Sequence, residues 1–133
     1  PQVQTTTLAH RIKATDSQGP DRVKVACSVS GRALYFSRAV IPYARKMPAQ
    51  QRDAHPLYLG HIGLYAHRFQ RLVRFAGLGP SPLEQAEKLE QLRLLENDLE
   101  IHVVVTRHSS IGVDRPQDLE RVRRLLESEE DPG

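Results

Sequence analysis

The chain of 133 residues lacks tryptophan and has one cysteine, Cys27. A lone cysteine excludes an internal disulfide and a metal site built from several thiolates, and it fits a reducing compartment, the cytoplasm. No apolar run approaches the roughly 18 residues of a membrane helix, and no charged stretch followed by an apolar one opens the chain. We therefore expect neither a membrane span nor a signal peptide. Aromatic residues make up only 5% of the chain, which is little for a domain that fills its core alone.

The chain also has little excess of one charge, because it contains 19 Lys and Arg and 16 Asp and Glu, which gives a net charge of +3. Such an excess permits binding of phosphates or nucleic acid without demanding it. The positive residues are scattered and few aromatic residues lie among them for base stacking, so we expect no nucleic-acid partner. The chain contains no phosphate-binding G-x-x-x-x-G-K-[ST] loop, no G-x-G-x-x-G motif and no close-spaced histidine pair for zinc.

Hydrophobic patterning predicts a mixed α/β fold. The expected elements are strands over 3–9, 22–29, 33–37 and 57–66, helices over 67–76 and 82–97, a buried strand over 101–106 and a helix from Pro116. Residues 44–56 and 107–115 are expected to be surface loops, and 127–133 a frayed tail. A turn at Ser30-Gly31 joins two strands into a hairpin. Glycines in the strand over 57–66 suggest close approach of another backbone.

The helix over 82–97 has the clearest start, because Ser81, Pro82 and Glu84 form the pattern of a capping box. Its wheel gathers acidic and amide side chains in one sector, in which leucines also fall. The pattern indicates a helix packed on more than one side, with its polar groups partly enclosed. The residues of that sector are Glu84, Glu87, Glu90 and Gln91, with Leu83 and Leu94 among them.

Three segments carry candidate chemistry, and each has an ordinary alternative. Arg38 ends a strand, either as a ligand-binding cation or as a solvated edge residue. His61 and Tyr65 flank Gly63 on one strand face, with room for a polar ligand between them or simply hydrogen-bonded within the core. Asp114 follows a buried strand and precedes a helix, where a carboxylate can ligate Mg²⁺ beside a phosphate or cap the helix.

Taken together and in this order, these segments resemble the C-terminal half of the 3-deoxy-manno-octulosonate (Kdo) cytidylyltransferases, the CMP-Kdo synthetases. Nine stretches match in register and span almost the whole chain. They are Thr7–Ala9, Val23–Val25, Gly31–Ala39, Ile41–Tyr43, His61–Ala66, Pro80–Glu84, Leu89–Arg93, Ile101–Val103 and Gly112–Arg123.

The resemblance implies a fold and a reaction. Residues 1–133 would be the sugar-binding and dimer-forming half of an α/β nucleotidyltransferase domain, with a mixed, mostly parallel sheet and flanking helices. The family transfers CMP from CTP to Kdo, releasing pyrophosphate, for lipopolysaccharide biosynthesis, and it requires Mg²⁺ and forms homodimers. Because the anomeric hydroxyl of the sugar attacks the α-phosphate in line, catalysis rests on positioning and on neutralisation of charge.

The resemblance also implies roles for residues. Asp114 matches the metal-binding Asp of the family, and Arg38 matches the Arg that meets the sugar carboxylate, so both are expected to be catalytic. A guanidinium suits a carboxylate because it can bind both oxygens. The expected sugar-binding residues are Arg38, His61, Tyr65, Glu90 and Gln91.

The chain departs from the family at several positions. Gly60 stands where the family has Arg, and Arg115 replaces the Thr after the metal-binding Asp. Glu96, Asn97 and Asp98 replace a stretch that is often aromatic and ends in Gly. The phosphate loop of the family and its Q-G-D segment, which supplies the other metal-binding Asp, have no counterpart in the sequence.

Two interpretations follow from these matches and absences. The first is part of a CMP-Kdo synthetase, and we expect the 133-residue chain alone to make no CMP-Kdo from CTP, Kdo and Mg²⁺. The second is a non-catalytic remnant or interaction module that keeps the sugar pocket or the dimer surface. A phosphate loop and a Q-G-D segment encoded upstream would favour the first.

Overall fold

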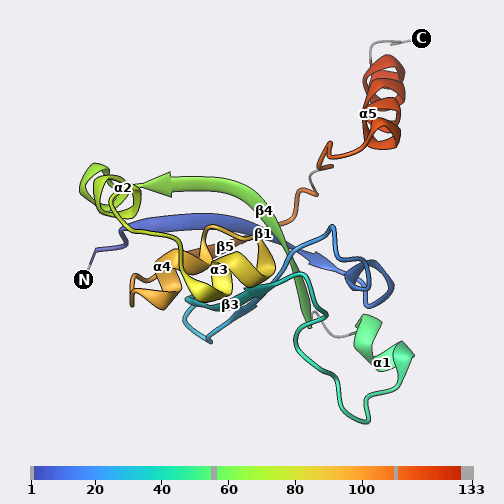
Figure 1. Cartoon of the computed structure of the whole chain (residues 1–133). Helices are drawn as coiled ribbons and strands as arrows, with labels where there is room; N and C mark the ends of the chain where they lie inside the picture. Colours follow the sequence, from blue (N-terminus) through green and yellow to red (C-terminus); the bar gives the residue numbers. More distant parts are fainter. Residues whose placement is uncertain (1, 55–56, 110, 130–133) are drawn as a thin grey trace.

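A computed structural model of the chain describes residues 2–54, 57–109 and 111–129. It is built around a five-stranded sheet of order β3-β2-β4-β1-β5 (Figure 1). The strands are β1 (Thr5–Ile12), β2 (Lys24–Cys27), β3 (Ala33–Ser37), β4 (Tyr58–His67) and β5 (His102–Thr106). The helices are α1 (Ala49–Ala54), α2 (Phe69–Ala76), α3 (Pro82–Glu87), α4 (Leu92–Glu96) and α5 (Pro116–Glu129), with a 3₁₀ turn at Thr15–Ser17.

The prediction of a mixed sheet with flanking helices is confirmed. The expectation that parallel pairing predominates does not hold for these strands, because only β1 and β5 pair in parallel. The pairs β1–β4, β2–β3 and β2–β4 are antiparallel. A tight turn joins β2 to β3 and makes that pair antiparallel, whereas β1 and β5, which are far apart in the sequence, pair in parallel.

The predicted hairpin is also confirmed. Its turn contains Gly31 at φ 83°, a backbone conformation that glycine adopts without steric cost. The Gly31 N–H donates to the Ser28 carbonyl at 3.0 Å, and the Ser28 N–H donates to the Arg32 carbonyl at 2.8 Å.

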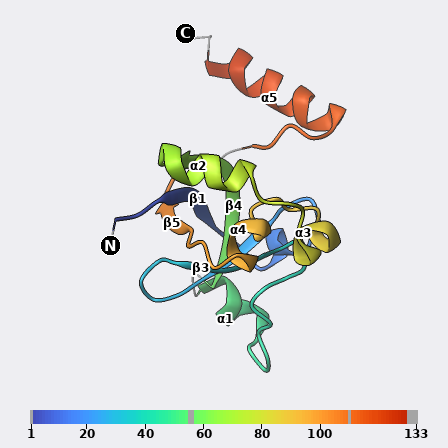
Figure 2. The same ribbon diagram turned by 60° about the vertical axis from the view of Figure 1, so that its left-hand side comes forward.

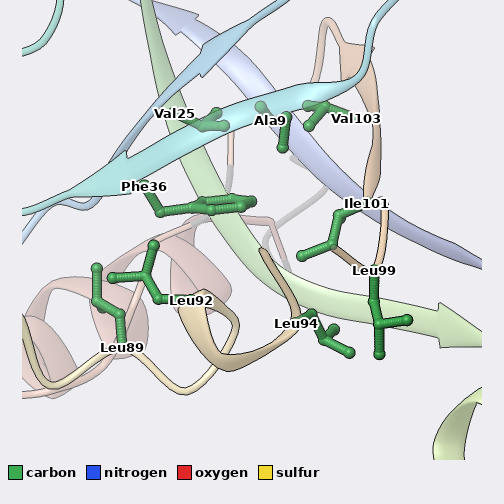
Figure 3. Packing of buried hydrophobic residues seen from close by; sticks show 10 residues of the cluster. Ala9, Val25, Phe36, Leu89, Leu92, Leu94, Leu99, Ile101 and Val103 are labelled. Carbon is green, nitrogen blue, oxygen red and sulfur yellow. The ribbon is translucent and has the colours of Figure 1, made fainter. Parts of the chain in front are cut away.

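The core lies between one face of the sheet and the segment that carries α3 and α4 (Figure 3). Leu89, Leu92 and Leu94 come from that segment and pack with Phe36 of β3 and with Ile101, the residue before β5. Phe36 is the one aromatic residue in this cluster of buried residues, which explains how a chain with few aromatic residues fills its core: aliphatic side chains from short elements do so.

The expectation of a single helix over 82–97 is wrong. The capping box at Ser81 and Glu84 forms as predicted, and α3 begins at Pro82. Lys88 then takes a left-handed conformation at φ 57°, which ends the helix, and α4 begins only at Leu92. No glycine or proline marks this break in the sequence, so periodicity alone did not reveal it.

Four further expectations need correction. The loop expected over 44–56 contains the helix α1. The strand expected to be buried has Val104 and Val105 exposed. These neighbours point to opposite faces, so neither face of β5, the edge strand next to β1, is covered at this point. The glycines of β4 do not serve close approach of a backbone to their side-chain position: the nearest atoms to a Cβ on Gly60 would be side-chain atoms, and a Cβ on Gly63 would meet nothing within 4 Å. Residues 127–129 of the expected frayed tail belong to helix α5. Residues 55, 56, 110 and 130–133 of the expected loops and tail lie outside the described residues.

The last helix begins at Pro116 as predicted, but α5 stands away from the sheet in both views (Figures 1 and 2). Its apolar stripe is therefore not part of the core, and Leu119, Leu125 and Leu126 are exposed. In the part of the chain that the structure describes, no helix is long and apolar enough to span a membrane.

Candidate functional site

The six residues singled out from the sequence line one cleft of about 550 Å³. They come from four parts of the chain: the end of β3, the middle of β4, the turn between α3 and α4, and the loop before α5. The sheet and the interrupted helix thus bring together side chains that are far apart in sequence. The six are Arg38, His61, Tyr65, Glu90, Gln91 and Asp114, and Gly63, Lys88 and Asp21 lie beside them.

The guanidinium of Arg38 is held by backbone carbonyls. Its Nε–H donates to the Glu87 carbonyl at 2.8 Å, Nη1 to Pro20 at 3.2 Å and Nη2 to Lys88 at 3.4 Å. A guanidinium has five N–H donors, so two remain. No carboxylate of the described residues forms an ion pair with this cation. Arg38 is therefore a fixed positive charge with two donors to spare, which suits a bidentate carboxylate ligand.

The break after α3 makes this arrangement possible. In a continuous α-helix the carbonyls of Glu87 and Lys88 would accept N–H groups four residues further on. The left-handed Lys88 ends that pattern, and both carbonyls accept from Arg38 instead. The helix interruption that the sequence did not reveal is thus part of the site.

The backbone of Arg38 is held by the carboxylate of Glu87. This carboxylate accepts the Arg38 N–H at 2.9 Å and the Ser37 hydroxyl at 2.5 Å. Burial acts to raise the pKa of Glu87, but these hydrogen bonds outweigh it and hold the pKa below its usual value. Glu87 was grouped with the acidic sector in the sequence, but its role behind Arg38 depends on contacts across about fifty positions.

Lys24 is the other residue behind the cleft, and its side chain is fully buried. Its ammonium donates to the carbonyls of Gly19 at 2.9 Å, Arg22 at 2.6 Å and Arg38 at 2.6 Å, which uses all three of its donors. Burial lowers the pKa of this amine, while the charge of Glu87 opposes the shift. Alternation along β2 indicated only a half-buried strand, so this buried lysine was missed.

His61 is a neutral group in the wall of the cleft, because burial lowers its pKa to about 4. Its Nε2 lies 2.9 Å from the hydroxyl of Thr7, which also lies 2.9 Å from the Leu64 carbonyl. The single hydroxyl proton goes to the carbonyl, so Thr7 accepts the Nε2–H of His61. Nδ1 of His61 is then left as a hydrogen-bond acceptor.

Tyr65, Glu90 and Gln91 complete the polar lining. Burial raises the pKa of Tyr65, and the nearby charge of Glu90 adds to the shift, so the phenol stays protonated at neutral pH. Gln91 is buried, yet its amide makes no hydrogen bond to any described residue. A buried amide without a protein partner fits a ligand hydroxyl. A Cβ on Gly63 would meet nothing within 4 Å, so the cleft is open beside this residue. The rings of His61 and Tyr65, however, contact each other with centroids 5.5 Å apart, so the expectation of room for a polar ligand between them is wrong.

The carboxylate of Asp114 is also without a partner among the described residues. Capping of α5 falls to Asp118, which accepts the N–H groups of Asp114 and Arg115 at 3.2 and 3.0 Å. The helix-cap alternative for Asp114 is therefore wrong. Mg²⁺ is bound by one or two carboxylates together with water and phosphate oxygens, and a free carboxylate in a cleft fits that requirement. No group of three potential metal ligands occurs in the described part of the chain.

The departures from the family pattern lie mostly outside this cleft. Glu96 accepts the Leu83 N–H at 3.0 Å and so caps α3, and the Asn97 amide donates to the Arg93 carbonyl at 2.7 Å. Asp98 has φ 57°, so it adopts the conformation that favours glycine. Arg115 pairs with Asp21 at 2.6 Å on the surface.

Comparison with known proteins identifies a family. A family model described as "Cytidylyltransferase" matches residues 1–101. The 3-deoxy-manno-octulosonate cytidylyltransferase of Lawsonia intracellularis is 56% identical over 93% of this chain and 47% of its own length. The corresponding protein of Nitratidesulfovibrio vulgaris (strain DP4) is 52% identical over 93% of this chain and 48% of its own length. The chain thus spans about half the length of these relatives.

A solved structure agrees with these relatives. It is described as CMP:2-keto-3-deoxy-manno-octonic acid synthetase complexed with CTP, and it superposes with a TM-score of 0.85 at 40% sequence identity. The match covers 97% of this chain and 51% of that protein.

Proposed function

Because the chain belongs to the cytidylyltransferase family, we propose that it supplies the sugar-acid side of an enzyme that transfers CMP from CTP to Kdo and releases pyrophosphate. The observation that carries the proposal is the fixed guanidinium of Arg38, with two unused N–H donors in a cleft that holds polar side chains. One cation suits the single carboxylate of a sugar acid.

The remaining residues are assigned by their chemistry. The amide of Gln91 and the carboxylate of Glu90 suit sugar hydroxyls, and Nδ1 of His61 can accept another. Arg38 and the polar lining would orient the anomeric hydroxyl toward the α-phosphate, and such positioning supplies much of the rate enhancement of a two-substrate reaction. Mg²⁺, when bound at Asp114, would neutralise charge on the phosphates.

The decisive experiment titrates Kdo into the 133-residue chain by calorimetry. We expect Arg38→Gln to weaken binding by roughly tenfold or more, because it removes a charge-assisted pair of hydrogen bonds. Arg123→Gln, on the exposed helix α5, is the matched control and should leave binding unchanged. Equal affinity of the wild-type chain and Arg38→Gln would refute the proposal.

A second test uses a complete cytidylyltransferase that contains this half. Arg38→Ala should raise KM for Kdo more than KM for CTP, since Arg38 is assigned to the sugar acid alone. Equal losses for both substrates would contradict that assignment. A chain that binds Kdo but gains no activity when both halves are present would favour the alternative of an interaction module that retains the pocket.

The proposal includes a setting and an assembly. The enzyme would act in the cytoplasm, where CTP is made, and its product would enter lipopolysaccharide biosynthesis. The free thiol of Cys27 suits a reducing compartment. The assembly would be a homodimer, and light scattering coupled to size-exclusion chromatography should give twice the mass of one chain. A monomer at all concentrations tested would contradict the dimer.

A further inference from the structure

The cleft has a second lobe that the sugar acid does not account for. This lobe measures about 510 Å³ and shares Asp21, Val23, His61, Gly63 and Asp114 with the first. The rest of its lining comes from β1, from the loop that precedes β2, and from the start of α5. The residues that distinguish it are His10, Arg22, Arg115 and Asp118.

Arg22 supplies the positive charge of this lobe that is unpaired among the described residues, and both its guanidinium and its backbone carbonyl have hydrogen-bond partners. Its Nη1 lies 3.0 Å from Nε2 of His10, and its carbonyl accepts the ammonium of Lys24 at 2.6 Å. His10 is buried, so it gives the guanidinium a rigid support. No carboxylate of the described residues forms an ion pair with Arg22. Ordering such a long side chain costs conformational entropy, and a further ligand of the guanidinium would offset this cost.

The His10 support depends on a neutral imidazole. Burial lowers the pKa of His10, and the charge of Arg22 lowers it further, so the ring is uncharged near neutral pH. A guanidinium can only donate, so Nε2 of His10 must accept its N–H and the ring proton lies on Nδ1.

Gly60 leaves room for this pair. A Cβ at position 60 would lie 3.0 Å from Cγ2 of Ile12, 3.3 Å from Cε1 of His10 and 3.6 Å from Cδ of Arg22. The space beside this glycine is therefore taken up by the side chains that support and form the cation. A larger residue at position 60 would push against both.

The other charges of the lobe are mostly neutralised. Asp21 pairs with Arg115 at 2.6 Å, and Asp118 accepts two backbone N–H groups. The charged groups left for a ligand are the guanidinium of Arg22 and the carboxylate of Asp114. A phosphoryl group with a bound divalent cation matches both, because its oxygens accept from a guanidinium while the cation takes the carboxylate.

We infer that Arg22, oriented by His10, is a further substrate-positioning residue that binds a phosphoryl group of the nucleotide in the second lobe of the cleft. The inference rests on the proposed function, which assigns the sugar acid to Arg38 in the first lobe. The phosphate would then bind Arg22 in the second lobe, and His61, Gly63 and Asp114 line both lobes. Lys24 fixes both arginines, since its ammonium binds the carbonyl of each. The backbone positions of the two arginines are thus tied to one buried residue.

The test measures binding of inorganic pyrophosphate and of CMP to the 133-residue chain in the presence of Mg²⁺. Arg22→Gln should weaken the binding of one or both ligands by roughly tenfold, because it removes a hydrogen bond between charged groups. Arg22→Lys, which keeps the charge but lacks the planar fork that His10 holds, should give a smaller loss. Arg123→Gln is the control for a lost surface charge. Melting temperatures of all variants should agree, because the Arg22 side chain is exposed.

The outcomes separate this inference from the proposed function. A greater loss for pyrophosphate would assign Arg22 to the leaving phosphates, and a greater loss for CMP to the α-phosphate. If Arg22→Gln binds both ligands as the wild-type chain does, the inference is overturned while Kdo binding through Arg38 still stands. Kdo affinity should be unaffected by Arg22→Gln. Failure of the wild-type chain to bind Kdo, pyrophosphate and CMP would overturn both.

Discussion

Two leucine-bearing helical regions of the chain have opposite environments. The segment with α3 and α4 is short and interrupted, yet Leu92 and Leu94 are 0% and 1% exposed. Helix α5 is longer and regular, yet Leu125 and Leu126 are 46% and 57% exposed. Figures 1 and 2 show the first against the sheet and the second away from it. Periodicity indicates that a helix forms, whereas burial depends on which surface is available to it.

The largest effect expected from this contrast comes from the buried region. Leu92→Ala should lower the free energy of unfolding by about 4 kcal/mol, because it removes a fully buried side chain and leaves a cavity. Urea denaturation followed by circular dichroism measures the change. The matched control is Leu126→Ala on α5, and a similar loss in both variants would show that the two regions do not differ.

The second effect concerns the polar groups beneath the cleft. Lys24→Met should cost about 3 kcal/mol, because three backbone carbonyls lose the ammonium that binds them. Urea denaturation again measures this, with Arg121→Met on α5 as the exposed control. Since Lys24 binds the carbonyls of Arg22 and Arg38, the variant should also weaken binding of Kdo. An unchanged stability would show that water replaces the ammonium at no cost.

The third effect is a pH dependence confined to the α3–α4 segment. The guanidinium of Arg93 binds both carboxylate oxygens of Glu84, and Nε–H donates to Oε2 at 2.8 Å. The hydrogen bonds from Arg93 outweigh partial burial and lower the pKa of Glu84 to about 2. The native carboxyl thus binds protons less readily than the unfolded one, whose pKa is near 4.5. Its stabilisation is complete above the unfolded pKa and is lost as the pH falls toward 2.

Glu84→Gln tests this dependence. The variant should be less stable than the wild-type chain at pH 6 to 7, and the difference should shrink as the pH falls from about 4.5 toward about 2. Thermal melting at a series of pH values measures it. Glu120→Gln on α5 removes a carboxylate from exposed pairs with Arg123 and Arg124, and it should change stability by no more than about 0.5 kcal/mol. A difference for Glu84→Gln that stays constant over this range would contradict the assignment.

Local patterns predicted most elements of the fold. The strands β2 and β4, the turn at Gly31 and the capping box at Ser81 depend on neighbouring residues, and all of them are present. The alternating burial expected along β2 is not, because Lys24 and Val25 are both buried. The left-handed Lys88 was not predictable in this way, because its carbonyl accepts a hydrogen bond from the guanidinium of Arg38, which lies fifty positions earlier at the end of β3. Resemblance placed the six site residues, and the structure gathers them in one cleft.

What the sequence did not predict is the set of residues behind that cleft. Lys24, Glu87 and His10 act through contacts between strands or between β3 and α3, and no spacing along the chain marks them. A lysine inside a strand looks solvated when only its own strand is considered. Its burial follows from three carbonyls that come from the loop before β2 and from the end of β3.

The smallest effect is expected on α5. The double substitution Leu119→Ser and Leu126→Ser should change the free energy of unfolding by no more than about 0.5 kcal/mol, since both side chains already contact water. Urea denaturation at two protein concentrations tenfold apart measures this. If the cost exceeds about 1 kcal/mol and grows with concentration, a second chain covers the stripe and the contrast between the two helical regions disappears in the assembly. A cost that does not depend on concentration would instead mean that α5 packs on its own chain.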